Sequence, residues 1–238
     1  MVSECTSTND LALQGSGEGG DGEVFLAERQ TAGRGRLGRR WEAPRASSVL
    51  CSVRLLEKYS VARWVHLSLA AGIAVHDAVR QAAAVSATLR WPNDLMVGDR
   101  KLAGILIEAR PHRANLHVAA VGVGINCLQH RGHFPPELRG RATSLDMESS
   151  QPIDRREVVR CLIAALDHWL DPEVLTDPQR LKDEWCGRSR LIGLRVRLRE
   201  RDRVYEGIVV DLDPNAGILV ALDEGVQRLF CPLTTSSL

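Results

Sequence analysis

The sequence predicts an α+β protein in which a larger domain, residues 1–187, precedes a compact β-barrel, residues 188–238. Two patterns carry this prediction. Up to Gly187, strand-like runs alternate with long amphipathic helical patterns, whereas the chain after it consists of short alternating runs separated by turns. The length of 238 residues suits one medium and one small domain, and the 44% of hydrophobic residues can form an ordinary core.

The larger domain is predicted to contain a sheet covered by amphipathic helices. Residues 60–84 place one broad apolar face at helical spacing, and their alanines allow close packing against a sheet. Residues 155–170 show a second apolar face of this kind. Residues 11–13 begin helically and lead into a glycine-rich segment at 15–22, which we expect to be a flexible connector. Strands are predicted at 24–28, 48–56, 87–91, 95–97, 101–109 and 117–125.

The smaller domain is predicted to be entirely β. Turn sequences at 213–217 and 223–225 separate its alternating runs. Its strands are predicted at 194–198, 205–212, 218–222 and 227–231. In the larger domain, the loop at 127–151 is long enough to suggest a function.

Composition excludes several classes of protein. The net charge of +1 argues against bulk affinity for nucleic acid, because the positive charge is local. Six scattered cysteines without a C-x-x-C pair, and no export signal, predict reduced thiols in a cytoplasmic protein. No apolar run approaches the roughly 20 residues of a membrane span.

The most informative segment is residues 33–41, which reads G-R-G-R-L-G-R-R-W. Its first eight residues hold four arginines and three glycines. Such a segment repels itself and has little intrinsic order, so we expect it to stay mobile until an anion binds. Guanidinium groups suit bidentate contacts with phosphate oxygens. The sequence therefore predicts a loop that captures a polyphosphate and closes over it.

The same segment also fits a dinucleotide-binding motif, but the residues around it support that interpretation less well than they support a polyphosphate-binding loop. Residues 33–38 fit G-x-G-x-x-G, and Glu57 follows about 20 residues later, as that fingerprint asks. The fingerprint also needs a helix that opens at its third glycine. Residues 39–48 lack helical apolar spacing and contain Pro44. We therefore do not expect a Rossmann fold.

Three further segments carry polar groups beside apolar elements. Lys101 begins the apolar run 102–107, so a rigid strand at the edge of the core would fix its ammonium, although a solvated lysine in a turn is the plain alternative. Asn93 and Asp94 follow a proline in a turn sequence. Ser7, Thr8 and Asn9 look like a helix N-cap.

Three segments in this order resemble the biotin protein ligases: 33–41, then R-W-P-N-D-L at 90–95, then R-K-L-A-G-I-L-I-E at 100–108. Those enzymes activate biotin with ATP to biotinyl-5'-AMP and transfer biotin to a lysine of a carrier protein. The resemblance covers nearly the whole chain and is densest over 27–126. It implies a mixed-sheet catalytic domain of the biotin/lipoate ligase type, followed by an SH3-like barrel. It also implies a biotin carboxyl carrier protein as partner, and Mg²⁺ with the ATP.

The resemblance assigns roles to individual residues. Lys101, Arg36 and Asp94 would be catalytic: Lys101 would contact the biotin carboxylate and the α-phosphate, and Asp94 would align Mg²⁺ and the ATP. The residues expected to bind biotin are Ser7, Thr8, Asn9, Gln30, Arg34, Gly35, Arg36 and Lys101. Those expected to bind the nucleotide are Arg34, Arg36, Arg39, Trp41, Asn93, Asp94, Lys101 and Asn126, with Trp41 stacking on a flat face such as adenine.

The chain departs from the family pattern at two places. Arg90 replaces the usual lysine before W-P-N-D, which keeps the charge, and we expect activity to survive. Only six residues precede Ser7, so the first sheet edge is expected to be short. With no DNA-binding domain before Ser7, we expect no transcriptional role. Both a monomer and a homodimer stay open.

Rival functions remain open at this point. A lipoate or octanoate ligase shares the fold and a catalytic lysine, but its relatives lack the pairing of G-R-G-R-x-G-R with W-P-N-D. A module that binds nucleic acid without catalysis is disfavoured by the near-neutral charge. Cys127 could suggest a thiol acyltransferase, yet we expect a neutral buried thiol. His130 and His133 are expected to be exposed loop residues and not metal ligands.

Overall fold

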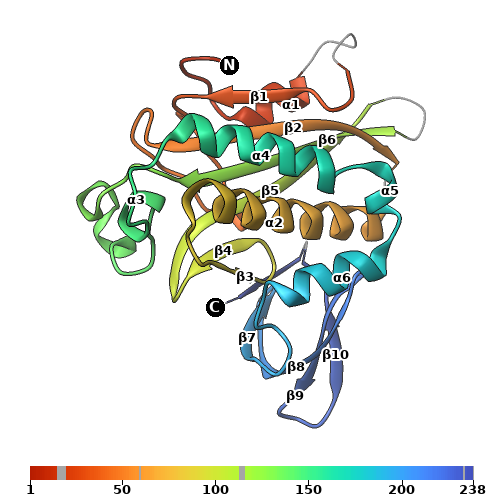
Figure 1. Cartoon of the computed structure of the whole chain (residues 1–238). Coiled ribbons are helices and arrows are strands. Elements are labelled where there is room, and N and C mark those ends of the chain that lie inside the picture. The colour runs from red at the N-terminus through yellow and green to blue at the C-terminus, as the bar shows by residue number, and fades with distance from the viewer. Residues whose placement is uncertain (15–19, 59, 113–115, 233, 238) are drawn as a thin grey trace.

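The computed structural model describes residues 1–14, 20–58, 60–112, 116–232 and 234–237. Within these ranges the strands form a six-stranded and a five-stranded sheet, and helices cover one face of the larger sheet (Figure 1). The α+β prediction is confirmed. Part of the predicted connector, residues 15–19, lies outside the described residues. Among the described helices, none combines the length and apolar character that a membrane span requires.

The larger sheet is built around its longest strands. Its order is β1-β2-β6-β5-β4-β3. The bounds are β1 Val24–Ala27, β2 Ser48–Lys58, β3 Thr88–Arg90, β4 Asp94–Val97, β5 Arg100–Pro111 and β6 Leu116–Asn126. Each of these strands lies within a few residues of its predicted position.

The expectation of a mixed sheet was wrong for the described strands. Every pair of named neighbours in the larger sheet is antiparallel. From β3 through β6 the short connections require this, because only a long crossover can return a chain parallel to its previous strand. Parallel pairing is limited to isolated bridges such as Val2 to Ala27 and Cys5 to Gln30.

Helices α2 Val61–Ala83 and α4 Arg155–Trp169 pack on one face of the sheet (Figure 1). Ser60 caps α2 by accepting a hydrogen bond from the backbone N–H of Arg63 at 3.0 Å. Leu67 and Ile73 of α2 are fully buried against the sheet. The short helices α5 Pro172–Leu175 and α6 Pro178–Gly187 follow, and the sequence analysis predicted neither.

The opposite face of the sheet holds α1 Thr8–Gln14 and the loop at 33–41. Alternation along β6 separates the two faces: Val121, Val123 and Ile125 belong to the core, whereas Gly122 and Gly124 line a cavity. The predicted loop after β6 contains the short helix α3 Leu145–Glu148 and two 3₁₀ turns. The large cavity of the protein therefore lies on the face away from α2.

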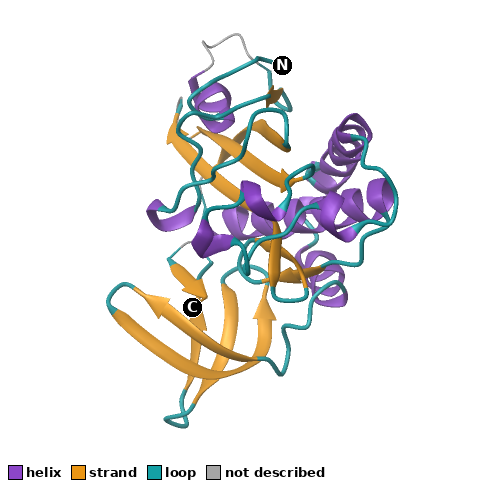
Figure 2. Cartoon of the chain, turned by 90° about the vertical axis from the view of Figure 1, so that its left-hand side faces the viewer, coloured by secondary structure: helices purple, strands orange, loops and turns teal. Residues whose placement is uncertain are grey.

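The C-terminal residues form the five-stranded sheet, gathered at one end of the molecule (Figure 2). Its order is β10-β9-β8-β7-β11, and all its pairs are antiparallel. The bounds are β7 Arg195–Glu200, β8 Arg203–Asp213, β9 Gly217–Leu222, β10 Gln227–Phe230 and β11 Thr235–Ser237. The first four match the predicted strands, and β11 was not predicted. Gly217 is required because a Cβ there would meet the carbonyl oxygen of Phe230 at 1.9 Å.

Polar contacts tie this sheet to the helices. Lys182 Nζ of α6 lies 2.6 Å from Asp211 Oδ1 of β8. His66 Nε2 of α2 lies 3.1 Å from Asn215 Oδ1 in the β8–β9 turn. The last residues of the chain lie beside the arginine-rich loop, where Arg36 donates to the carbonyls of Pro232 and Thr235.

Candidate active site

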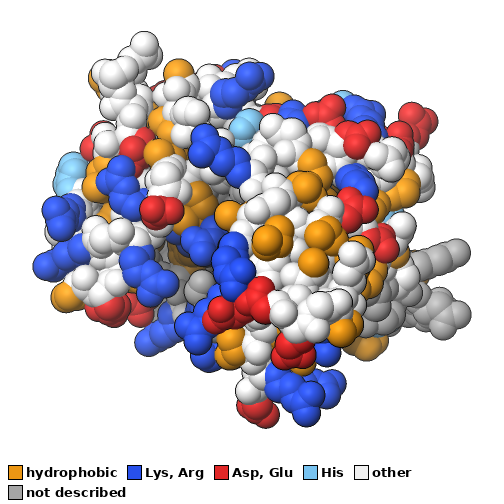
Figure 3. All heavy atoms as spheres, turned by 90° about the horizontal axis from the view of Figure 1, so that it is seen from below, with side chains coloured by type: hydrophobic (Ala, Val, Ile, Leu, Met, Phe, Trp, Pro, Cys, Tyr) orange, Lys and Arg blue, Asp and Glu red, His pale blue; other side chains and the backbone are white. Residues whose placement is uncertain are grey.

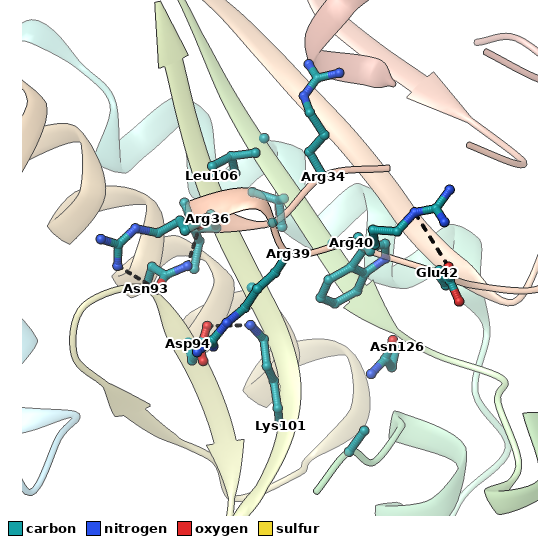
Figure 4. Close-up of a pocket in the computed structure, with 18 of the residues that line it drawn as sticks. Arg34, Arg36, Arg39, Arg40, Glu42, Asn93, Asp94, Lys101, Leu106 and Asn126 are labelled. Atoms are coloured by element: carbon teal, nitrogen blue, oxygen red, sulfur yellow. Dashed lines mark hydrogen bonds and ion pairs between the residues drawn. The ribbon is translucent and has the colours of Figure 1, made fainter. Parts of the chain in front are cut away.

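All thirteen residues that the sequence analysis placed in the site line one cavity of about 590 Å³ (Figure 4). They come from the start of α1 and the residue before it, the loop between β1 and β2, the β3–β4 turn with the first residue of β4, β5 and the end of β6. Seen from below, one side of the molecule gathers Lys and Arg side chains (Figure 3). The thirteen predicted residues that line the cavity are Ser7, Thr8, Asn9, Gln30, Arg34, Gly35, Arg36, Arg39, Trp41, Asn93, Asp94, Lys101 and Asn126.

Trp41 lies against two glycines that face each other across β5 and β6. Gly104 and Gly124 are register partners. A Cβ on Gly124 would lie 2.6 Å from Cε2 of the indole, and one on Gly104 would lie 3.3 Å from Cζ3. The two strands thus leave room for the ring only because neither residue has a side chain. Trp41 forms a wall of the cavity beside Lys101, whose Nζ is 5.8 Å from the ring centroid.

A β-bulge aims Lys101 into the cavity. The register between β4 and β5 shifts so that Leu95 faces Ala103 while Met96 faces Lys101. Without this shift, alternation would put Lys101 on the core side together with Ala103. Instead its Cε lies 3.0 Å from the Cβ position of Gly104, on the cavity side.

Lys101 is fixed by hydrogen bonds of its backbone and by an ion pair of its ammonium. Its backbone N–H donates to the carbonyl of Arg141 at 2.8 Å, and its carbonyl accepts from Thr143 N–H at 2.9 Å. Its Nζ lies 2.6 Å from Asp94 Oδ1 (Figure 4). The long loop after β6 therefore helps to fix the lysine that the motif predicted to be catalytic.

Arg36 reaches across the cavity to the end of the chain. Its guanidinium donates to Asn93 Oδ1 at 3.2 Å, to the carbonyl of Thr235 at 2.8 Å and to the carbonyl of Pro232. Burial lowers the pKa of this guanidinium from its ordinary value, and Asp94 opposes that shift. Sequence reasoning missed the part that the C-terminal segment plays here, because no local pattern links positions so far apart.

The loop itself has a defined turn structure. Gly35 N–H donates to the carbonyl of Arg39 at 2.7 Å, and Trp41 N–H donates to the carbonyl of Gly33 at 3.0 Å. Arg39 extends from this loop toward Asp94 and Lys101, whereas Arg34 points away from them (Figure 4).

Arg34 is occupied by two carboxylates. Its Nη2 lies 2.6 Å from Asp10 Oδ1 and 3.0 Å from Glu108 Oε2, and its Nε lies 3.0 Å from Glu108 Oε1. The hydrogen bond from Arg34 holds the pKa of Asp10 below its ordinary value. Neither carboxylate was among the predicted site residues, although each stands directly in or beside a quoted motif.

The N-terminus of α1 presents a compact set of polar groups. Gln30 Oε1 accepts from the N–H of Thr8 at 2.8 Å. Ser52 donates to Asn9 Oδ1 at 2.6 Å, and the Ser52 and Thr8 hydroxyls are 2.7 Å apart. Gly122 lies beneath, where a Cβ would meet Asn9 Oδ1 at 2.3 Å. Sequence reasoning missed Ser52, whose only signal was a hydroxyl at an interior position of a mostly apolar strand.

The side-chain amide of Asn126 forms hydrogen bonds with two residues of the protein. Its Nδ2 donates to the carbonyl of Thr143 at 2.9 Å, and its Oδ1 accepts from Gln129 at 3.0 Å. In this state it anchors the long loop, and its contact with a nucleotide stays a prediction.

The other polar candidates do not form a second site. Burial raises the pKa of the Cys127 thiol to about 12, so the thiol is neutral, as expected. The rings of His130 and His133 lie 5.0 Å apart on exposed residues. Within the described ranges, no group of three or more His, Cys, Asp or Glu side chains could hold a metal ion.

Comparisons with known proteins find chains that are similar to this one. The model of the biotin/lipoate A/B protein ligase family matches residues 2–126. The biotin–[acetyl-CoA-carboxylase] ligase of Mycobacterium tuberculosis is 39% identical over 222 residues, which cover 90% of this chain and 79% of the relative. The Aquifex aeolicus biotin protein ligase in complex with biotin and ATP superposes with a TM-score of 0.83 at 25% identity, covering 100% of this chain and 97% of that one.

A longer relative matches over part of its length. The bifunctional ligase/repressor BirA of Bacillus subtilis is 28% identical over 210 residues, covering 88% of this chain. The match spans 65% of that relative, just under two thirds of its length.

Proposed function

Because this chain belongs to the biotin/lipoate A/B protein ligase family, we propose that it activates biotin with ATP and transfers biotin to a lysine of a biotin carboxyl carrier protein. One observation carries this proposal: a single cavity has two chemically different ends. One end holds the polar groups around Asn9, and the other holds Lys101 and Arg36. A ligand with a neutral polar head and a carboxylate tail matches both ends, with a polyphosphate at the cationic end.

The proposed reaction has two steps. A carboxylate oxygen of biotin attacks the α-phosphorus of ATP, the bond from that phosphorus to the α,β-bridging oxygen breaks, and pyrophosphate leaves. The ε-amine of the acceptor lysine then attacks the carbonyl carbon of biotinyl-5'-AMP. AMP leaves with the bonding electron pair, and the nitrogen loses a proton to solvent. The product is an amide.

Lys101 is the proposed electrostatic catalyst of the first step. Two anions must approach each other there, so the site has to supply positive charge where negative charge develops. Lys101 stands on a bulged strand, and the loop at Arg141 and Thr143 fixes its backbone. Asp94 holds the ammonium in place before substrate arrives.

Arg36 and Arg39 are proposed to bind phosphate and to close over the intermediate. Biotinyl-5'-AMP is a mixed anhydride that water destroys, so a loop that covers it protects as well as binds. Asn93 supports Arg36 directly, at 3.2 Å. Trp41 and Asn126 complete the proposed nucleotide end of the cavity.

The end of the cavity around Asn9 is proposed to bind the ureido ring of biotin. This ring carries two N–H donors and one carbonyl acceptor. Ser7, Thr8, Asn9, Gln30 and the backbone at Gly35 offer matching groups within the cavity. Several of these groups are already oriented by hydrogen bonds, so little ordering is needed when the ring binds.

The acidic groups of the cavity fit Mg²⁺ that arrives with ATP. Mg²⁺ is commonly bound by one or two carboxylates together with substrate phosphates, and a dedicated protein cage is unusual. Asp94 is the proposed ligand, and bound Mg²⁺ would neutralise charge on the phosphates.

We also propose that residues 188–238 form an SH3-like barrel domain after a catalytic domain at 1–187. The five antiparallel strands support this proposal. The buried Leu198, Val209 and Phe230 of this sheet join the same hydrophobic core as the larger domain. Helix α6 ends at Gly187, eight residues before β7 begins at Arg195.

Exchange of labelled pyrophosphate into ATP tests the proposal. The purified chain should catalyse exchange that depends on biotin, because the first step is reversible and releases pyrophosphate. Lipoate and octanoate serve as competing substrates, and retention of RNA without exchange would indicate a nucleic-acid-binding module. Exchange that is driven by lipoate and not by biotin would overturn the proposal in favour of a lipoate ligase.

A further inference from the structure

Arg34 joins three segments that are distant in the sequence. It reaches from the arginine-rich loop to Asp10 in α1 and to Glu108 in β5. With Glu108 it forms a two-pronged contact, Nε to Oε1 and Nη2 to Oε2, each at 3.0 Å. The three side chains are only 36%, 23% and 29% exposed for Arg34, Asp10 and Glu108. We call these three residues the clasp.

The charges in the clasp direct Arg34 away from phosphate. Two carboxylates contact one guanidinium, so the clasp has a net negative charge and would repel a phosphate group. Arg34 also points away from Lys101 and Asp94 (Figure 4). The sequence analysis expected Arg34 to bind both biotin and nucleotide, but this geometry favours the biotin end alone.

The clasp continues into Asn9. Glu108 Oε2, which accepts from Arg34, also accepts from Asn9 Nδ2 at 2.7 Å. On its other side Asn9 Oδ1 accepts from Ser52 at 2.6 Å. Asn9 is 3% exposed and lies on Gly122, so its amide has one orientation set by these partners.

We propose that Asp10 and Glu108 are positioning residues that act through Arg34 and Asn9 to organise the biotin end before the ligand binds. Arg34 serves this end and makes no contact with the polyphosphate. A neutral ureido ring gains little from a free charge but gains from donors and acceptors that are already ordered. This inference rests on the proposed function, since it names the groups that organise its biotin end.

Titration calorimetry on Glu108→Gln tests the clasp. Glutamine keeps the shape of the side chain but removes its charge and one acceptor for Arg34. Because this change weakens the contacts that orient both Arg34 and Asn9, we expect the Kd of biotin to rise about 10-fold or more. The KM for ATP in pyrophosphate exchange should stay within about twofold, because the clasp does not touch that end.

A matched control is available on the surface. Glu157 makes the same two-pronged contact with Arg160 on α4 as Glu108 makes with Arg34. Glu157→Gln should leave both constants unchanged. Arg34→Met and the double variant with Glu108→Gln should raise the Kd of biotin by about the same factor as the single change, because all three disrupt one unit.

The outcomes separate this inference from the function on which it rests. A wild-type chain that binds no biotin contradicts the proposed function. A wild-type chain that binds biotin, with variants that bind it equally well, contradicts the clasp. An equal rise in the KM for ATP in Arg34→Met would place Arg34 on the phosphates and overturn the inference. If Glu108→Gln lowers the melting temperature too far for calorimetry, Asp10→Asn provides the same test.

Discussion

The ammonium of Lys101 and the carboxylate of Asp94 form an ion pair of 2.6 Å inside the cavity. The two residues come from neighbouring strands, and the β-bulge between those strands turns both side chains to the same side. The pair keeps a cation ready in the cavity and balances it until anionic substrates bind. Both residues were predicted to take part in the reaction, and their contact links the two motifs that predicted them.

Replacing Lys101 with alanine should abolish formation of biotinyl-5'-AMP. Loss of one group that stabilises transition-state charge lowers rates by about 10²–10³. The fold should remain, because the side chain is partly exposed. Lys182→Ala is the control, since Lys182 makes an ion pair of equal length with Asp211 outside the cavity. Adenylation above about a tenth of the wild-type rate in Lys101→Ala would contradict this role.

Arg36→Gly should allow the intermediate to escape. The partly buried guanidinium of Arg36 ties the loop to Asn93 and to the C-terminal segment, so its loss should weaken closure of the loop more than it weakens the chemical step. We expect the variant to biotinylate a bystander such as serum albumin in proportion to time and ATP. Arg29→Gly, which removes a surface arginine paired with Glu4, should stay selective. A variant without adenylation would place Arg36 in the chemical step, and a selective variant would leave it no role in closure.

Gly122→Ala should weaken biotin binding. The added Cβ would lie 2.3 Å from Asn9 Oδ1, so the amide must move away from its place in the site. Gly140→Ala adds a methyl group where nothing lies within 4 Å, and it should behave as wild type. Calorimetry with biotin and thermal melting would be measured for both variants. Unchanged biotin affinity in Gly122→Ala would show that the position of Asn9 does not matter for the ligand.

Asp10→Asn should flatten the response of stability to acid. Arg34 lowers the pKa of Asp10 in the folded chain. Such a group contributes stability above its unfolded pKa, near about 4, and that contribution is lost as the pH falls through the lower folded pKa. The melting temperature of wild type should therefore exceed that of the variant at pH 6, and the two should converge toward about pH 2. A constant difference across this range would contradict the assignment.

Cys127→Ala should retain both adenylation and transfer. The thiol is fully buried and its pKa is raised to about 12 by burial, so it is not a nucleophile at neutral pH. We expect only a lower melting temperature from the small cavity. Loss of transfer with intact adenylation would instead support an acyl-thioester route.

The sequence by itself determined most of the helices and strands, and it indicated thirteen residues that line one cavity. Helix α2, the central strands and most strands of the C-terminal sheet follow from local periodicity and turn chemistry, which depend on residues close in the chain. The same is true of the motifs: Lys101, Asn93 and Asp94 stand within a few residues of turns that local sequence defines. These residues line one cavity because β4 and β5, which carry or flank them, are neighbours in the sheet.

Only the tertiary structure decided the orientation of the charged side chains. Periodicity alone would turn Lys101 into the core, and the bulge against β4 reverses that. Arg34 was expected to bind both biotin and nucleotide, and Glu108, 74 positions away, holds its guanidinium pointing away from Lys101 and Asp94. Arg36 is held by Thr235, 199 positions away. Such contacts arise when segments that are distant in the sequence pack together. The free energy of a charged group depends on these spatial neighbours and not on the residues next to it in the sequence.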